Sequence, residues 1–392
     1  MNKWFTTLER KETDSAKWQG AHAKAKRDDV LAFSVADSDY ETAPAIKAAL
    51  MKRVAHGAFG YARPGHAYRE AVVSWSRRRY NLTIEPEWVE PAPKVLNALS
   101  VIIDVFTQPG DGVLIQTPVY HVFDPVIRQN RRRVIEHELA CNAGNYSIDF
   151  DRLDNDLKDA SMFILCSPHN PVGRVWKESE LARIVSLCKK HDVYLISDEI
   201  HADLVMKGHR FISCGAHFDA HDKLILVSAP SKTFNVAGLQ IAHTIIKHAP
   251  TRKRLMTAYQ RLHLTGPNVL ALTAIEAAYT EGDAWVDAQN QHVEANYQML
   301  KTRWESLSDT ARITPLEGTY LAWLDVSFTG YDGETFCQRL ATQHGVVLSH
   351  GSAFGRQSTA FVRMNLACSK AQLTKGIKRI ETFVSDAAST KK

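Results

Sequence analysis

Several signals that would define a class of protein are missing from this sequence of 392 residues. No run of 18 apolar residues occurs, which argues against a membrane-spanning helix. The opening stretch, MNKWFTTLERKETDSAKW, is polar and charged, and it contains neither an apolar signal-peptide core nor a small-residue cleavage site. We therefore expect a cytoplasmic protein without a membrane partner.

Cysteine is scarce, and its positions are scattered. None of the six cysteines forms a C-x-x-C pair, which argues against a disulfide framework and against a zinc knuckle. The 17 histidines include no H-E-x-x-H or other metal-ligand spacing. We therefore predict no metal site.

Strong charge of one sign is also absent. The net charge is +5, and the arginine runs at 77–79 and 131–133 have no interleaved aromatic residues. Such runs are typical of solvated faces, so no nucleic-acid partner is expected. No G-x-G-x-x-G follows an early strand, which argues against a nicotinamide-dependent dehydrogenase.

The chain is longer than one hydrophobic core usually serves, which favours two lobes. No linker rich in Gly, Pro or Ser separates them, so we expect tight packing between the lobes. We predict an N-terminal segment (1–45) that joins the smaller domain, a large domain (46–285) and a small C-terminal domain (286–392).

Short apolar runs alternate with helical periodicity from about residue 90 onward. Strands are predicted in 113–118, 131–139, 161–168, 193–200 and 222–230, with helices at 95–106, 149–160 and 177–192. Continuous apolar strands separated by helices indicate an α/β fold with a mostly parallel sheet, covered on both faces. Beyond residue 285 the pattern predicts a smaller α+β lobe.

Polar side chains follow four of the predicted strands. They are Tyr120, Asn170, Asp198 with His201, and Ser231 with Lys232. Because ligands bind outside the carboxyl ends of the strands in such sheets, we expect these side chains to line one site.

Lys232 stands at the end of a buried strand, although an unpaired buried ammonium costs several kcal/mol. An amine at a strand end, with an aspartate on a neighbouring strand, suits an aldehyde cofactor. Pyridoxal 5′-phosphate needs a lysine, an acid that keeps its ring nitrogen protonated, and an anion site. Lys232 would hold this cofactor and act as the base at the substrate α-carbon, and Asp198 would hold the ring proton.

The phosphate group of that cofactor needs N–H and hydroxyl donors. A helix predicted to begin at Val95 and Leu96 would offer its N-terminus, and Ser228 and Ser231 could add hydroxyl groups. We also expect the Tyr120 ring to lie on the cofactor ring.

Four motifs are similar, in this order, to the signature of fold type I enzymes of the class I/II aminotransferase superfamily: SPHNPVGRVW, ISDEIHADL, SAPSKTFNVAGL and FVRMNLA. The stretches KETDSAKW, SVADSDYETAP, FGYARPG and DEIH resemble the MalY/PatB branch of cystathionine β-lyase-like carbon–sulfur lyases. The resemblance implies a large domain with a mostly parallel seven-stranded sheet between helices, plus a smaller α+β domain.

The resemblance also implies roles for individual residues. Lys232 matches the Schiff-base lysine, Asp198 the partner of the ring nitrogen, and Asn170 the donor to the ring 3′-oxygen. Tyr120 matches the stacking aromatic, and His201 belongs to the cofactor site of the lyase branch.

Further roles concern the substrate and a second subunit. Arg363 matches the arginine that pairs with the substrate α-carboxylate, and Asp37 joins it in the predicted substrate site. Tyr61 matches a tyrosine that reaches the phosphate of the neighbouring subunit's cofactor, which implies a homodimer. Lys232, Tyr61 and Tyr120 form the predicted catalytic set.

The sequence departs from these patterns at a few positions. His201 stands where aminotransferases often have tyrosine, as in the lyase branch, and Gln240 replaces an arginine that would bind the phosphate. Ser34 and Ser38 replace the Trp and Met of the branch motif WVADMDF, near the expected substrate entrance.

Three functions are consistent with these residues. The first is β-elimination on a sulfur amino acid such as cystathionine or cysteine, which yields pyruvate, ammonia and a thiol. The second is an aminotransferase built from the same parts. The third is a regulatory scaffold that binds pyridoxal phosphate and contacts a partner protein.

Overall fold

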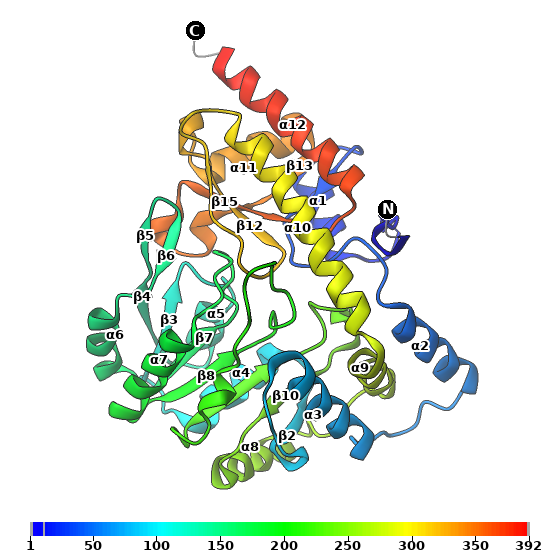
Figure 1. Ribbon diagram of the computed structural model, residues 1–392, viewed down its shortest axis with the longest axis vertical. Coiled ribbons are helices and arrows are strands. Elements are labelled where there is room, and N and C mark those ends of the chain that lie inside the picture. Colours follow the sequence, from blue (N-terminus) through cyan, green and yellow to red (C-terminus); the bar gives the residue numbers. More distant parts are fainter. Residues whose placement is uncertain (1–2, 11, 390–392) are drawn as a thin grey trace.

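The computed structural model describes residues 3–10 and 12–389 (Figure 1). Lys11 of the KETDSAKW motif lies outside the described residues, as do the ends of the outer two predicted domains. No described helix combines the length and the apolar character that crossing a membrane requires.

A seven-stranded sheet forms the centre of the larger part of the molecule. Its strands, in spatial order, are β2 (Val89–Ala92), β10 (Ala242–Ile245), β9 (Leu224–Ser228), β8 (Tyr194–Asp198), β7 (Met162–Cys166), β3 (Gly112–Thr117) and β4 (Arg133–Glu138). Strand β10 runs antiparallel to both of its neighbours, β2 and β9, and the remaining pairs are parallel. The predicted mostly parallel seven-stranded sheet is therefore confirmed.

Helices cover both faces of this sheet, because the central strands β3, β7, β8 and β9 bury side chains on both of their faces. One face packs against α4 (Val95–Phe106), α5 (Phe123–Gln129) and α8 (Ala249–Arg261). The other packs against α3 (His66–Tyr80), α6 (Phe150–Asp156), α7 (Glu178–Lys190) and α9 (Val269–Glu281). Helix α2 (Pro44–His56) lies against α9.

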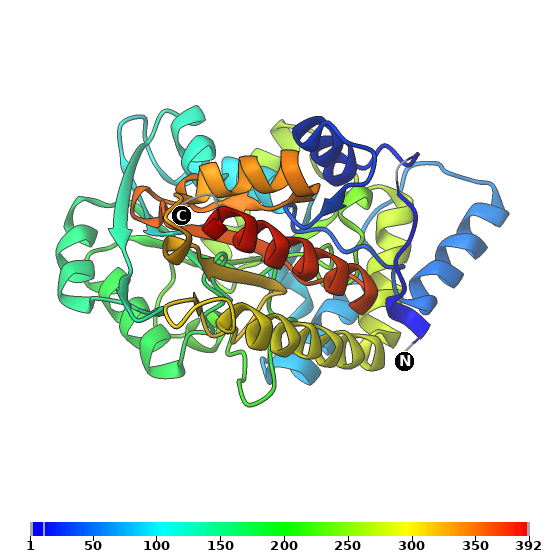
Figure 2. The same cartoon turned by 90° about the horizontal axis from the view of Figure 1, so that it is seen from above.

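A second, antiparallel sheet builds the smaller part. Its strands, in spatial order, are β11 (Arg312–Ile313), β12 (Leu321–Asp325), β15 (Phe361–Asn365) and β14 (Ser349–His350). Helices α10 (Asp283–Glu305), α11 (Gly333–His344) and α12 (Lys370–Ser389) accompany it, and Figure 2 shows them side by side in yellow, orange and red. A separate hairpin is formed by β5 (Ala140–Asn142) and β6 (Asn145–Ser147).

The N-terminal segment lies beside the C-terminal part of the chain. Strand β1 (Leu31–Ala32) pairs in parallel with β13 (Val346–Val347), and α1 (Ala16–Ala25) contacts α11. Helix α10 crosses the boundary predicted after residue 285 without a break. The two domain boundaries, after residues 45 and 285, stay predictions.

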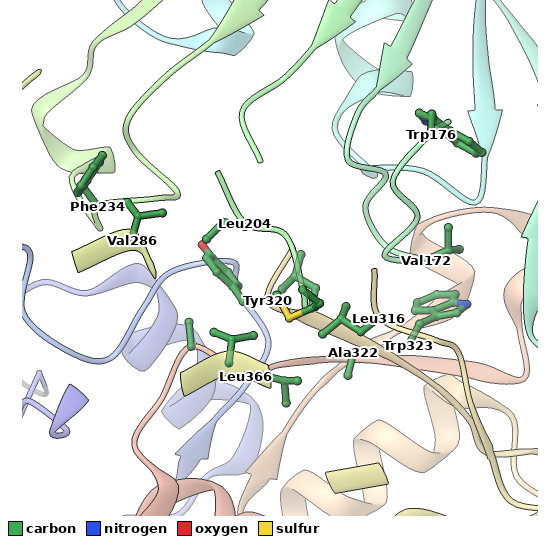
Figure 3. Packing of buried hydrophobic residues seen from close by; sticks show 14 of the residues in the cluster. Val172, Trp176, Leu204, Phe234, Val286, Leu316, Tyr320, Ala322, Trp323 and Leu366 are labelled. Atoms are coloured by element: carbon green, nitrogen blue, oxygen red, sulfur yellow. The ribbon is translucent and has the colours of Figure 1, made fainter. Parts of the chain in front are cut away.

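One continuous apolar cluster joins the two sheets (Figure 3). Trp323 of β12 and Tyr320, which directly precedes that strand, share it with Leu204 and Trp176, which belong to loops of the larger part. The two parts are therefore packed tightly together, as the absence of a linker predicts.

A buried ion pair fixes the N-terminal segment. The Asp39 carboxylate accepts hydrogen bonds from Lys17 Nζ at 2.8 Å, Trp18 Nε1 at 3.0 Å and Gln372 Nε2 at 2.8 Å. Lys17 and Asp39 are both buried. Since Gln372 belongs to α12, this carboxylate ties α1 and the segment after β1 to the last helix.

We predict that Asp39→Ala destabilises the protein strongly, because it leaves the Lys17 ammonium buried without its counter-ion. The expected loss in the free energy of unfolding is about 3–5 kcal/mol, measured by urea denaturation. Glu41→Ala, which removes an exposed pair with Lys47, is the matched control and should cost less than about 1 kcal/mol. Equal effects of the two changes would contradict the anchoring role of Asp39.

Candidate active site

A cavity of about 550 Å³ opens at the carboxyl edge of the larger sheet. Most of the predicted site residues line it: Val95, Leu96, Tyr120, Asn170, Asp198, His201, Ser231, Lys232 and Arg363. Strands β3, β7, β8 and β9 supply the central members, since parallel strands bring their carboxyl ends to one edge. The smaller part and the N-terminal segment complete the wall with Ser349 and with residues 34–36.

Lys232 lies in the turn that follows β9. The turn is closed by a hydrogen bond from Phe234 N–H to the Pro230 carbonyl at 2.9 Å. The Nζ of Lys232 donates to the backbone carbonyl of Ala36 at 2.8 Å. Burial lowers the pKa of this amine, although the carboxylates of Asp37 and Asp198 oppose the shift. A lysine with a lowered pKa has a larger fraction of free amine, the form that acts as nucleophile and base.

The turn is tied to the N-terminal segment by a second contact. Asn235 adopts a left-handed backbone conformation with φ of 56°, and its side-chain amide donates to the carbonyls of Ser38 and Tyr40. The position of Lys232 therefore depends on residues almost two hundred positions earlier in the chain.

Asp198 is the last residue of β8 and is buried. Its carboxylate accepts a hydrogen bond from the Ile200 N–H at 3.2 Å. Burial raises the pKa of this carboxyl to about 7, while that hydrogen bond and the Lys232 charge act in the opposite direction. The group is thus poised to hold a proton together with a basic partner such as a ring nitrogen.

Arg363 on β15 is buried and lines the same cavity from the smaller sheet. One guanidinium nitrogen donates to Asn170 Oδ1 at 3.0 Å and another to the Ser34 carbonyl at 2.8 Å. Its Nε has no hydrogen-bond partner in the described part of the chain. Burial lowers the pKa of Arg363 to about 10, so the group stays charged near neutral pH. A buried guanidinium with neutral acceptors suits an anionic ligand such as a carboxylate.

His201 and Tyr120 supply the remaining rings of the site. Burial and the nearby Lys232 and Arg363 charges lower the pKa of His201 to about 3, so its imidazole is neutral. The Nδ1 atom of His201 is buried and lacks a partner within the described residues. The orphaned nitrogens of His201 and Arg363 fit a site that is built to hold a polar ligand.

The N-terminus of α4 forms the end of the cavity that suits a phosphate. No side chain caps this helix, which begins at Val95 after Lys94, and both residues line the cavity with Leu96. Free N–H groups in the first turn and the Ser231 hydroxyl can together bind an anion.

Ser228 is not brought to this cavity. Its hydroxyl donates to the Glu199 carbonyl at 3.1 Å, and it lines a separate small void with Trp75 and Leu226. The reason is strand alternation, since Ser228 and Leu226 share one face of the sheet, whereas Ala229 reaches the cavity. The prediction that Ser228 binds the phosphate did not take this alternation of side chains into account.

Asp37 and Tyr61 also lie outside the cavity lining. Asp37 pairs with Arg10 at 2.9 Å, and its carbonyl accepts hydrogen bonds from Lys17 and Asn365, so it positions the segment next to Lys232. Tyr61 is fully exposed and lies on a separate groove with Pro267. The single chain described here does not place Tyr61 in the site.

Three basic residues of the cavity were not predicted from the sequence. Lys24 reaches it from α1, Lys94 precedes α4, and His121 follows Tyr120. His121 and Lys94 had a local signal, because each adjoins a predicted site residue, Tyr120 and Val95 respectively, whereas Lys24 had none.

Comparison with known proteins decides the family. The model of the family described as aminotransferase class I and II matches residues 28–380. The chain belongs to this family. Cystathionine β-lyase PatB of Bacillus subtilis is 37% identical over 96% of this chain and 98% of its own length. Protein MalY of Escherichia coli is 32% identical over 94% of this chain and 95% of its own.

A solved structure extends the likeness to three dimensions. Cystalysin from Treponema denticola, which contains a pyridoxal 5′-phosphate cofactor, superposes with a TM-score of 0.94. It is 32% identical and covers 98% of this chain and 99% of its own. The resemblance to the MalY/PatB branch and the fold predicted for this aminotransferase-family member are therefore confirmed.

The raised pKa of Asp198 predicts how the stability of this family member depends on pH. Between about pH 4 and 7 the folded, ligand-free protein binds more protons at this carboxyl than the unfolded chain does, so its stability falls as pH rises. Asp198→Asn should therefore stabilise the ligand-free protein at pH 8, by at most about 4 kcal/mol, and the gain should shrink toward pH 4. Urea denaturation at several pH values measures it.

The exposed Asp151 provides the control for this measurement, because Asp151→Asn should change stability little at any pH. A gain for Asp198→Asn that is independent of pH would show that the titration of Asp198 is not its cause.

Proposed function

We propose that this protein is a carbon–sulfur lyase that depends on pyridoxal 5′-phosphate and eliminates a thiol from the β-carbon of a sulfur amino acid. The products are pyruvate, ammonia and the thiol. The observation that carries the proposal is the convergence of Lys232, Asp198 and Arg363 on one cavity. This arrangement occurs in a chain whose relatives are named as cystathionine β-lyases.

The cavity has a suitable residue for each part of the cofactor. Lys232 would be the covalent attachment point, and Asp198 would hold the ring proton. Asn170 and His201 would supply polar contacts to the ring, and Tyr120 an aromatic contact. The N-terminus of α4 at Val95 and Leu96 would bind the phosphate together with Ser231.

When bound, pyridoxal phosphate supplies an electron sink for bonds broken at the substrate α-carbon. Arg363 holds the substrate α-carboxylate, because its charge has no carboxylate partner among the described residues. This contact orients the α-hydrogen toward the Lys232 amine, which takes the proton. To accept this proton, the Lys232 amine gives up its hydrogen bond to the Ala36 carbonyl.

The second bond to break joins the β-carbon to sulfur. The sulfur leaves with the bonding electron pair and gains a proton, which gives the free thiol. The remaining three-carbon unit takes up one water molecule and separates into pyruvate and ammonia. The sum is one thioether amino acid and one water converted to thiol, pyruvate and ammonia, without an external oxidant or reductant.

An aminotransferase is the second candidate, and the description of the matching family favours it. Both reactions begin with removal of the α-proton by Lys232. They differ in the next step. In the lyase the sulfur leaves, whereas in the aminotransferase the proton is delivered to another atom and a second keto acid is consumed.

Incubation with cystathionine tests the two candidates directly. We expect pyruvate and free thiol in equal amounts without any added keto acid, and no product with Lys232→Ala. The same variant should lose the visible absorption of the bound cofactor. Product formation that requires a second keto acid would support the aminotransferase instead.

A homodimer accompanies this proposal. Several large apolar side chains near Tyr61 in sequence are exposed, namely Met51, Val54 and Phe59. Large apolar side chains that are exposed within one short stretch of the chain favour a protein–protein interface. We infer that a second copy covers this surface and that Tyr61 contributes to the partner's active site. The cytoplasmic location stays a prediction.

Mixing two inactive variants tests the role of Tyr61 across the interface. Lys232→Ala and Tyr61→Ala homodimers should each be weak or inactive. After subunit exchange, a mixed dimer contains one site with both residues intact, so about half of the mixed dimers' full activity should return. Sedimentation measures the dimer, and a mixture that stays inactive despite subunit exchange would contradict the shared site.

A further inference from the structure

The lining of the cavity contains more cationic than carboxylate side chains. Its lining contains Lys24, Lys94, Lys232 and Arg363. Asp198 is the only carboxylate that the described residues contribute to this lining. Such an imbalance in a partly enclosed space attracts anions.

Most of these charges already have a task in the proposed function. Arg363 takes the α-carboxylate, Lys232 is the attachment point, and Asp198 takes the ring proton. Lys94 stands directly before α4, at the end that suits the phosphate. Lys24 has no such task, and it forms no ion pair with any described residue.

Lys24 is placed at the mouth of the cavity. It lies in the last turn of α1 and is exposed, as is another lining residue, Val35, which is 42% exposed. Asp198 and Arg363, by contrast, are buried at the inner end. Because the inner end would hold the cofactor and the α-carboxylate, the β-substituent of a substrate would extend toward the mouth.

The wall near Lys24 offers a further polar group without negative charge. His121 lines it, and the charges of Arg363, His350 and Lys24 contribute, after burial, to the lowered pKa of His121. The neutral imidazole can donate a hydrogen bond to the same anion that Lys24 attracts.

We propose that Lys24 binds a carboxylate on the departing thiol, so that the preferred substrates are cysteine thioethers with an anionic end. This inference rests on the proposed lyase function and names the substrate class of the same site. Lys24 acts on specificity, because it contacts the leaving group at a distance from the bonds that break.

Two substrates that differ only in charge test the inference. They are S-(2-carboxyethyl)-L-cysteine and its carboxamide, S-(2-carbamoylethyl)-L-cysteine, with release of pyruvate and thiol as the readout. We expect wild-type kcat/KM to favour the carboxylate, and Lys24→Gln to lower its kcat/KM about three- to fivefold, mainly through KM. The carboxamide should be unaffected by this change.

Three comparisons separate charge recognition from a structural effect. Lys24→Arg should keep the preference for the carboxylate, and Lys24→Glu should reverse it. Lys26→Gln, which removes an exposed charge two residues away and outside the cavity lining, should behave as wild type. Added salt should weaken the preference in the wild type, since exposed charges are screened.

The outcomes also distinguish this inference from the function on which it rests. If the wild type releases thiol from neither substrate nor from cystathionine, the lyase function is wrong. If it cleaves both thioethers with equal kcat/KM, or if Lys24→Gln lowers both values equally, the lyase stands and the role of Lys24 is overturned.

Discussion

The guanidinium of Arg363 joins the three parts of the chain that surround the candidate active site. It lies on β15 of the smaller sheet, and it donates to Asn170 beyond β7 and to the Ser34 carbonyl in the N-terminal segment. A buried cation needs hydrogen bonds, and both of these acceptors are neutral. Its charge therefore stays available to an anion, and that anion site exists only when all three parts are packed together.

The N-terminal segment is also held by contacts with distant parts of the chain. Asp39 anchors it to Lys17 and α12, the carbonyls of Ser38 and Tyr40 accept from Asn235, and the carbonyl of Ala36 accepts from Lys232. Backbone carbonyls thus hold the reactive amine without neutralising it. Asp198 shows an unfavourable consequence of this arrangement, because its burial without a strong partner raises the pKa of its carboxyl. Groups that are suited to bind a ligand are seldom those that most stabilise the ligand-free fold.

The central strands and the order of the polar residues after them could be predicted, because continuous apolar runs signal buried parallel strands. Strands β2 and β10 were not identified, since each has only four residues and β2 contains Pro91. Ser228 was expected in the site because it ends a strand, yet alternation turns it to the other face. Position along a strand is visible in sequence, whereas the face on which a single side chain emerges depends on the register of the whole sheet.

The sequence by itself determined the chemistry that this protein brings together, because residue types at the carboxyl ends of parallel strands must meet at one edge. Lys232, Asp198, Asn170 and Tyr120 follow from that rule alone. The tertiary structure alone decided that Lys24 stands at the mouth of the cavity, that Ser34 meets Arg363, and that Ser228 lies elsewhere. These placements depend on long-range contacts such as the pairing of β1 with β13, which no local pattern of residues encodes.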